Sequence, residues 1–216
     1  MRSVLLWLLS LPAIALAATD GAPSLDRPAL LRALRAGGLV VAMRHTHSPN
    51  TLPDEATAEP DNAQRERQLD DEGRRSAAAL GEALRRLRIP VGQVYSSPTF
   101  RARQTVTLAK LPTPQTPAQL GDSGQSMQGD SSGTRGGWLR SLASQVPKRG
   151  TNTWIVSHFP NLTEAFPDDT GGLADGEALV IRSDGHGGLT VLARVRIEDW
   201  AQLDSANSSN GRVVKP

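Results

Sequence analysis

The stretch Leu39-Val40-Val41-Ala42-Met43-Arg44-His45 decides the fold. Five apolar residues follow one another directly after Gly37-Gly38, and an arginine and a histidine come next. A short apolar run bounded in this way predicts a strand in the interior of a sheet, buried on both faces. We therefore expect a central strand that ends by presenting Arg44 and His45.

Helices and further strands are expected on both sides of this strand. Asp26 can cap a helix that begins at Pro28, and Gly37-Gly38 can end it. The expected helices span residues 28–36, 70–87, 98–110, 138–146 and 162–166. The other expected strands span residues 91–96, 153–157, 178–183 and 189–197, and loops are expected over 46–66 and 111–135. Strands separated by helices predict an α/β fold with a mainly parallel sheet that helices cover on both faces.

Polar residues follow three of the expected strands. His45 follows the central strand, Ser96-Ser97 end the next one, and His158 ends a third. Ligands of parallel sheets bind at the carboxyl ends of the strands, so we expect a site at this edge. The loop over 46–66 is long for a compact domain, and such loops are more often binding features than simple connections.

The first 18 residues have the features of an export signal. Met1 and Arg2 give a positive start, an almost unbroken apolar run follows, and Ala15-Leu16-Ala17 fits the A-x-A cleavage pattern. An uncleaved membrane anchor is the alternative, but the run is shorter than the ~20 residues that span a bilayer. We expect a cleaved signal over 1–18, one domain over 19–204 and a flexible tail over 205–216. The mature protein is then periplasmic or secreted, without stable membrane insertion.

Composition narrows the chemistry further. The chain has no cysteine, which excludes disulfides, thiol nucleophiles and thiolate metal sites. Arginine carries almost all of the positive charge, since lysine occurs only at Lys110, Lys148 and Lys215. The planar fork of arginine binds phosphate or carboxylate oxygens in pairs. No block of basic residues alternates with aromatic ones, so we expect no nucleic-acid partner.

Two histidines and two arginines could handle a phosphoryl group at the sheet edge. A neutral imidazole such as His45 is a nucleophile towards phosphorus when a hydrogen bond fixes its other nitrogen. Arg44 could bind the phosphoryl oxygens, and Arg101 lies in the first turn of an expected helix, where free backbone N–H groups also attract anions. His158 could hydrogen-bond the same oxygens. Taken singly, His45 could equally be a satisfied core histidine and Arg101 a solvated surface residue.

Three ordered segments carry a resemblance to a known family. They are Met43-Arg44-His45-Thr46, the block SSPTFRARQT over 96–105, and the block VSHFPN over 156–161. In this order and at this spacing they resemble the histidine phosphatase superfamily, the phosphoglycerate mutase-like proteins. Thr46 stands where the family's RHG signature has glycine.

The resemblance implies a fold and a set of roles. The fold would be a three-layer α/β/α sandwich. His45 would be the nucleophile that becomes phosphohistidine, and Arg44, Arg101 and His158 would form the phosphate pocket, with Thr46 as a further substrate-binding residue. The reaction would need no cofactor and no metal.

The proton donor is where the sequence departs from the family. A leaving alkoxide needs a proton, which a carboxylic acid usually supplies. Many members have a glutamate between the second and third segments, but no glutamate occurs here between Glu82 and Glu164. Asp122 is the best-placed carboxylate, Asp130 is second and Glu164 is a third option. The missing glutamate is also typical of a preference for good leaving groups, or of an inactive site.

We therefore expect a metal-independent phosphomonoesterase that acts on a small phosphorylated substrate or a phosphorylated envelope component. A mutase is less favoured because it would have to keep its phosphoenzyme dry and rebind the product. The first alternative is a phosphate-ligand or partner-binding module of the same fold with weak or no catalysis. The second is a metal enzyme in which His45, His47 and His158 bind zinc, although the pattern H-x-H-x-D-H is not continued after His47.

Overall fold

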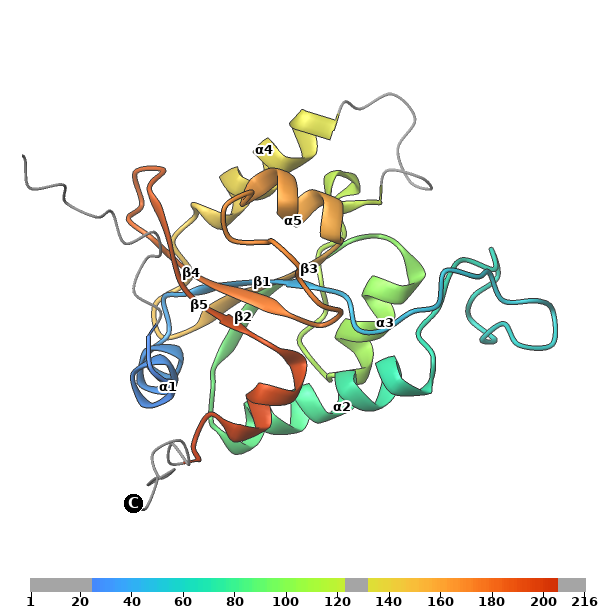
Figure 1. Ribbon diagram of the computed structural model, residues 1–216, viewed down its shortest axis with the longest axis horizontal. Coiled ribbons are helices and arrows are strands. Elements are labelled where there is room, and N and C mark those ends of the chain that lie inside the picture. Colours follow the sequence, from blue (N-terminus) through green and yellow to red (C-terminus); the bar gives the residue numbers. More distant parts are fainter. Residues whose placement is uncertain (1–24, 123–131, 206–216) are drawn as a thin grey trace, which may run out of the picture.

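The computed structural model describes residues 25–122 and 132–205. The expected signal over 1–18, Asp130 and most of the expected tail lie outside these residues. In the described part, no helix is long and apolar enough to cross a membrane. This part of the chain forms one sheet with helices on both faces (Figure 1).

The sheet has five strands in the order β2-β3-β1-β4-β5, with β1 in the centre. The strands are β1 (Val40–Arg44), β2 (Val91–Ser96), β3 (Asn152–Ser157), β4 (Ala178–Ser183) and β5 (Leu189–Val195). Strands β1, β2 and β3 are parallel, whereas β4 and β5 add an antiparallel edge beside β1. The expected central strand and its parallel neighbours are confirmed.

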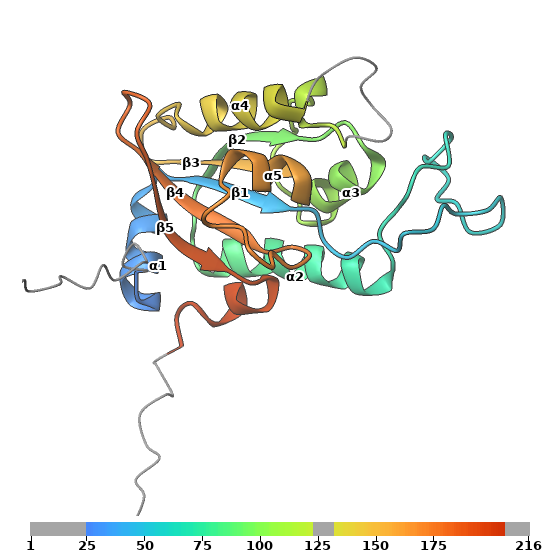
Figure 2. The same ribbon diagram turned by 45° about the horizontal axis from the view of Figure 1, so that its top comes forward.

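Two helical layers enclose this sheet (Figures 1 and 2). One layer holds α1 (Arg27–Ala36), α2 (Asp71–Arg86) and α3 (Phe100–Leu108), and the other holds α4 (Ser132–Ala143) and α5 (Phe159–Ala165). Side chains of β1 alternate between the layers, with Val41 and Met43 in one core and Val40 and Ala42 in the other. This burial on both faces explains the unbroken apolar run of β1 and confirms the three-layer sandwich.

Three helices differ from the sequence-based expectation at their starts. Helix α3 begins at Phe100 with Thr99 as its N-cap, and the hydroxyl of Ser97 lies 2.8 Å from Nε2 of His158 while it accepts from Thr99 N–H at 3.2 Å. Helix α4 begins at Ser132 and includes Gly136, where a Cβ atom would come within 2.4 Å of the Glu164 Cβ atom. Close packing of α4 on α5 therefore stabilises a turn that glycine alone disfavours. Helix α5 begins at Phe159.

A short 3-10 helix after β5, Ile197–Gln202, has no counterpart among the expected elements. It buries Trp200, whose ring lies 5.3 Å from that of Trp154 in β3. Both tryptophans belong to the core between the sheet and the layer of α1, α2 and α3.

The topology determines which segments meet at one edge of the sheet. The parallel strands β1, β2 and β3 all end there, and the antiparallel strand β4 begins there, with Met43 opposite Ala178. The segment before β4 therefore reaches the same edge as His45. The loop after β1 projects from this edge as a separate lobe before α2 (Figure 2).

Candidate active site

The backbone at His45 is fixed by its neighbours on both sides. The His45 N–H donates to the Ser157 carbonyl at 3.0 Å, and the His45 carbonyl accepts from Gly176 N–H at 3.0 Å. Thr46, the next residue, is 1 % exposed, and its N–H donates to the Thr105 hydroxyl of α3. The site's first histidine is therefore held by β3, α3 and the segment before β4.

The hydrogen bonds of His45 define its tautomer. Nδ1 lies 2.7 Å from the Thr46 carbonyl, which can only accept, so Nδ1 carries the proton. Nε2 accepts from Nε of Arg101 at 3.1 Å, and a guanidinium can only donate. The Nε2 lone pair of a neutral imidazole thus points into the site.

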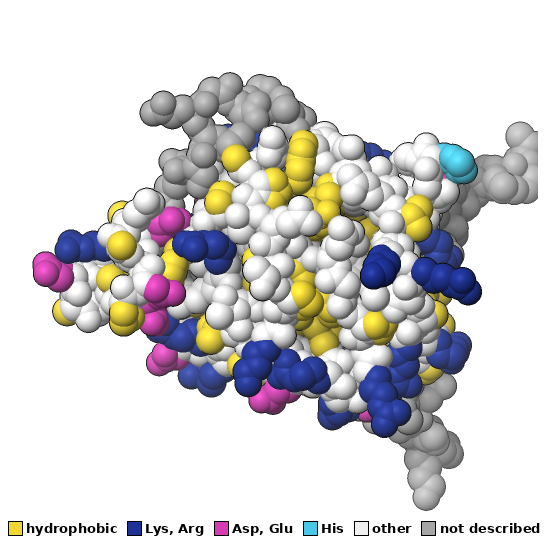
Figure 3. Space-filling model, turned by 180° about the vertical axis from the view of Figure 1, so that it is seen from behind, with side chains coloured by type: hydrophobic (Ala, Val, Ile, Leu, Met, Phe, Trp, Pro, Cys, Tyr) yellow, Lys and Arg dark blue, Asp and Glu magenta, His cyan; other side chains and the backbone are white. Residues whose placement is uncertain are grey.

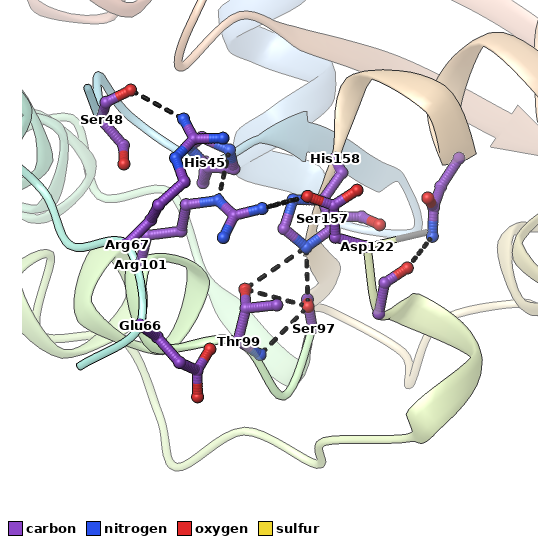
Figure 4. Close-up of polar contacts among 12 residues, drawn as sticks. His45, Ser48, Glu66, Arg67, Ser97, Thr99, Arg101, Asp122, Ser157 and His158 are labelled. Carbon is purple, nitrogen blue, oxygen red and sulfur yellow. Dashed lines mark hydrogen bonds and ion pairs between the residues drawn. The ribbon is translucent and has the colours of Figure 1, made fainter. Parts of the chain in front are cut away.

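Arg101 connects the two histidines (Figure 4). It is 1 % exposed, and its Nη2 lies 3.2 Å from Nδ1 of His158 and forms an ion pair with Asp122. Nε2 of His158 therefore carries that ring's proton and lies 2.8 Å from the Ser97 hydroxyl. Nη1 of Arg101 is buried and has no hydrogen-bond partner among the described residues. An unpaired buried cationic donor of this kind indicates a place for an anion.

Burial keeps both imidazoles neutral. It lowers the pKa of His45 well below the usual value, and the neighbouring His158, Arg101 and Arg44 act in the same direction, against the opposing hydrogen bond to Thr46. Burial also lowers the pKa of His158, with Arg101, Arg67 and Arg44 adding to the effect. His45 can therefore act as a nucleophile at neutral pH without first losing a proton.

The positions of Arg44 and Thr46 add detail to their expected roles. Arg44 forms an ion pair with Asp175 at 2.7 Å, and its guanidinium lies 5.7 Å from the centre of the Phe159 ring. Its Nε atom is buried without a partner in the described part of the chain. The Thr46 hydroxyl lies 3.2 Å from that of Thr105, so this side chain joins the site to α3.

The three expected proton donors are now distinguished by place. Asp122 lies in the site through its ion pair with Arg101. Asp130 lies outside the described residues. Glu164 is exposed on α5 and accepts from Gly136 N–H at 3.2 Å, so it joins α5 to α4. Asp122 is the carboxylate that the fold brings to the histidines.

Arg67 is a site residue that sequence reasoning missed. Its Nε donates to the Pro49 carbonyl at 2.7 Å and its Nη2 to the Ser48 carbonyl at 2.9 Å, which place the guanidinium beside His45 (Figure 4). Its charge also lowers the pKa values of Arg101 and His158. Arg67 lies at the end of a polar loop in a chain that is rich in arginine, so nothing in the sequence indicated that it belongs to the site.

The geometry does not support the three-histidine zinc alternative. Nδ1 of His47 lies 2.7 Å from a carboxylate oxygen of Asp70, the N-cap of α2, so His47 is bound away from the other two histidines. Within the ranges that the structure describes, no group of three histidine, aspartate or glutamate side chains is arranged to hold a metal ion.

Known proteins resemble this chain in sequence and in fold. The family model of the histidine phosphatase superfamily (branch 1) matches residues 40–122. The protein histidine phosphatase SixA complexed with tungstate is 17% identical with a TM-score of 0.55, covering 74% of this chain and 98% of its own. A phosphoserine phosphatase mutant from Entamoeba histolytica, in complex with phosphoserine, is 12% identical with a TM-score of 0.52, covering 74% and 98%. At these identities the likeness to solved structures shows the fold. No curated protein sequence matches significantly.

Proposed function

Because the chain belongs to the histidine phosphatase superfamily, we propose that it is a metal-independent phosphomonoesterase that works through a phosphohistidine at His45. One observation carries this proposal. A neutral His45 directs its Nε2 lone pair at Arg101, a buried guanidinium with one donor left over. Phosphoryl transfer requires such an arrangement, since catalysis there consists mainly of positioning and charge stabilisation.

In the first step the phosphoryl oxygens bind Nη1 of Arg101, with Arg67 and Arg44 as further cations. Nε2 of His45 replaces its contact with Arg101 by a bond to phosphorus, and the bond from phosphorus to the ester oxygen breaks. The electron pair of that bond stays on the leaving oxygen, which takes a proton from Asp122. The proton on Nδ1 stays bonded to the Thr46 carbonyl, so the phosphorylated ring keeps its orientation.

Asp122 must gain the proton that it gives. Its ion pair with Arg101 is an interaction of the ionised carboxylate. An incoming phosphoryl dianion competes for the same guanidinium, and the displaced carboxylate takes its proton from the solvent before it acts as the donor. In the second step Asp122 accepts a proton from the water that attacks phosphohistidine, and phosphate leaves with His45 neutral again.

For the natural substrate, the proposal names a class of compounds rather than one compound. We propose a small phosphorylated substrate or a phosphorylated envelope component outside the cytoplasm, reached through export by the segment over 1–18. Recovery of the processed chain from the periplasm or the medium tests the location.

The second candidate function is a binding module with weak catalysis. It is favoured by the ion pairs that Arg101 and Arg44 both form with aspartates in this structure.

Hydrolysis of p-nitrophenyl phosphate in the presence of EDTA tests the proposal. We expect turnover by the wild type and loss in His45→Ala, whereas His186→Ala, in the exposed turn between β4 and β5, serves as the matched control. Asp122→Asn should slow an alkyl phosphate about 10²-fold or more and an aryl phosphate far less, since a phenolate leaves without a proton. Turnover that EDTA abolishes would refute the mechanism, and tungstate binding without turnover would favour the binding module.

A further inference from the structure

A cleft of about 530 Å³ lies beside the phosphate-binding residues. The loop over 46–66 forms one wall, and Pro98 with the segment over 116–118 forms the other. Pro98 stands between Ser97 and Thr99, which both lie within hydrogen-bonding distance of His158. The wall at Pro98 therefore continues directly into the active site.

Glu66 is fixed in its place in this cleft. Its carboxylate accepts from Phe100 N–H at 3.0 Å, at the start of α3, one residue before Arg101. Its backbone N–H and carbonyl both bond the side chain of Asn62, which is 3 % exposed. The lobe thus holds a carboxylate beside the phosphate pocket, and the charge of Glu66 raises the pKa of Arg101 against the effect of burial.

Arg65, the neighbouring cleft residue, is placed differently. Its side chain is 53% exposed and lies 3.5 Å from the carboxylate of Glu55, which is 89% exposed. Basic and acidic side chains accordingly both appear on the projecting loop at the left of Figure 3. Arg65 belongs to the solvent side of the cleft, whereas Glu66 is anchored at the helix that carries Arg101.

The charge of Glu66 decides what the cleft can hold. A phosphoryl group would be repelled there, while Arg101 and Arg67 attract it a short distance away. The cleft therefore suits the organic part of the ester, with apolar walls at Leu52, Pro98 and Ala118 for its carbon atoms. A carboxylate beside such walls favours a cationic hydrogen-bond donor.

We propose that this cleft binds the leaving group of the substrate, and that Glu66 selects leaving groups that carry a protonated amine. The inference rests on the proposed function, because it assumes that phosphate esters are turned over at His45. The substrate class is then an aminoalkyl phosphate ester, with the phosphoryl group on the arginines and the ammonium group against Glu66.

Binding of phosphonates tests the inference without depending on turnover. Calorimetry with aminoalkyl phosphonates, and with neutral alkyl phosphonates of the same length, gives a ratio of dissociation constants. We expect the wild type to favour the amine, and Glu66→Gln to lower that preference about fivefold, the effect of one ion pair at a partly buried site. Glutamine still accepts from Phe100 N–H, so the fold should persist. Glu55→Gln makes the same chemical change on the same loop outside the cleft and should leave the ratio unchanged.

The preference for amines can also be measured as the ratio of kcat/KM between aminoalkyl and neutral alkyl phosphate esters. This ratio separates the specificity proposal from the phosphatase proposal. If p-nitrophenyl phosphate is hydrolysed through His45 but amines are not preferred, the specificity inference fails and the phosphatase proposal stands. If amines are preferred in binding and no ester is hydrolysed, the phosphatase proposal fails, and the cleft is an amine-binding site rather than a leaving-group site. A preference for carboxylate-bearing ligands that Arg65→Gln abolishes would overturn the role of Glu66.

Discussion

Acidification should destabilise this protein through the two histidines of the site. Both rings are buried, and burial is the largest cause of the lowered pKa of each. In the unfolded chain both rings have the ordinary pKa of about 6.5. Between that value and the lower folded one, the unfolded chain binds protons that the folded chain does not.

The sign and size of the effect follow from this difference. The free energy of unfolding rises with pH wherever the unfolded state binds more protons. The contribution of the two histidines is therefore fully present above about pH 6.5 and is lost as the pH drops below that value. Each histidine contributes about 1.4 kcal/mol per pH unit in this range. From pH 7.5 to pH 5.0, about 1.5 units lie below 6.5, which sets an upper bound of about 2 kcal/mol for each ring and about 4 kcal/mol for both.

Urea denaturation at the two pH values measures this loss. The double variant His45→Asn, His158→Asn keeps side-chain acceptors for Arg101 but removes the titrating rings, so the loss of unfolding free energy between the two pH values should shrink, by up to about 4 kcal/mol. The loss should be unchanged in His186→Asn, because this residue is exposed in the β4–β5 turn. An equal loss in the wild type and the double variant would refute the argument that the rings are held neutral.

Four further predictions concern the site and the core. Asp175→Asn should tighten tungstate binding about two- to fivefold in a competition assay, because Arg44 loses a partly exposed carboxylate partner. Gly81→Ala should lower the unfolding free energy by about 2 kcal/mol or more in urea titrations, since a Cβ atom would lie 1.9 Å from a backbone carbonyl after α3. Gly137→Ala in α4, where a Cβ atom meets nothing within 4 Å, should instead raise it by about 0.5–1 kcal/mol. Asn152→Ala should cost about 2–4 kcal/mol in the same assay, because this buried amide bonds backbone groups next to α1, β1 and β2.

The strands and their ends could be predicted because local pattern and tertiary burial agree there. The apolar run of β1 is buried on both faces, and β2 spans Val91–Ser96 as expected. His45, Arg101 and His158 could be placed at one edge because carboxyl ends of parallel strands meet there. No such rule predicts the antiparallel pairing of β4 with β1, which depends on contacts far apart in the chain.

The features of the fold and of the site that the sequence did not predict depend on contacts between residues far apart in the chain. Arg67 belongs to the site because two carbonyls of the distant end of its own loop hold its guanidinium. Asp175 reaches Arg44 only because β4 runs antiparallel to β1. Helix α4 begins early because it packs closely on α5, which its own glycines would not indicate. In each case the deciding partner is distant in the chain, and residue spacing does not reveal it.

The charge balance of the site gives it a selectivity of its own. Arg44 and Arg101 each already have an aspartate partner, whereas Arg67 is held by neutral carbonyls. A monoanion that displaces Asp122 or Asp175 exchanges one carboxylate contact for another and gains little. A phosphoryl dianion has three oxygens and can contact the arginines together, so it can displace both carboxylates with a net gain. We therefore expect inhibition by tungstate and phosphate to be far stronger than inhibition by acetate or nitrate. Equal inhibition by monoanions and dianions would show that the aspartates do not compete for the site.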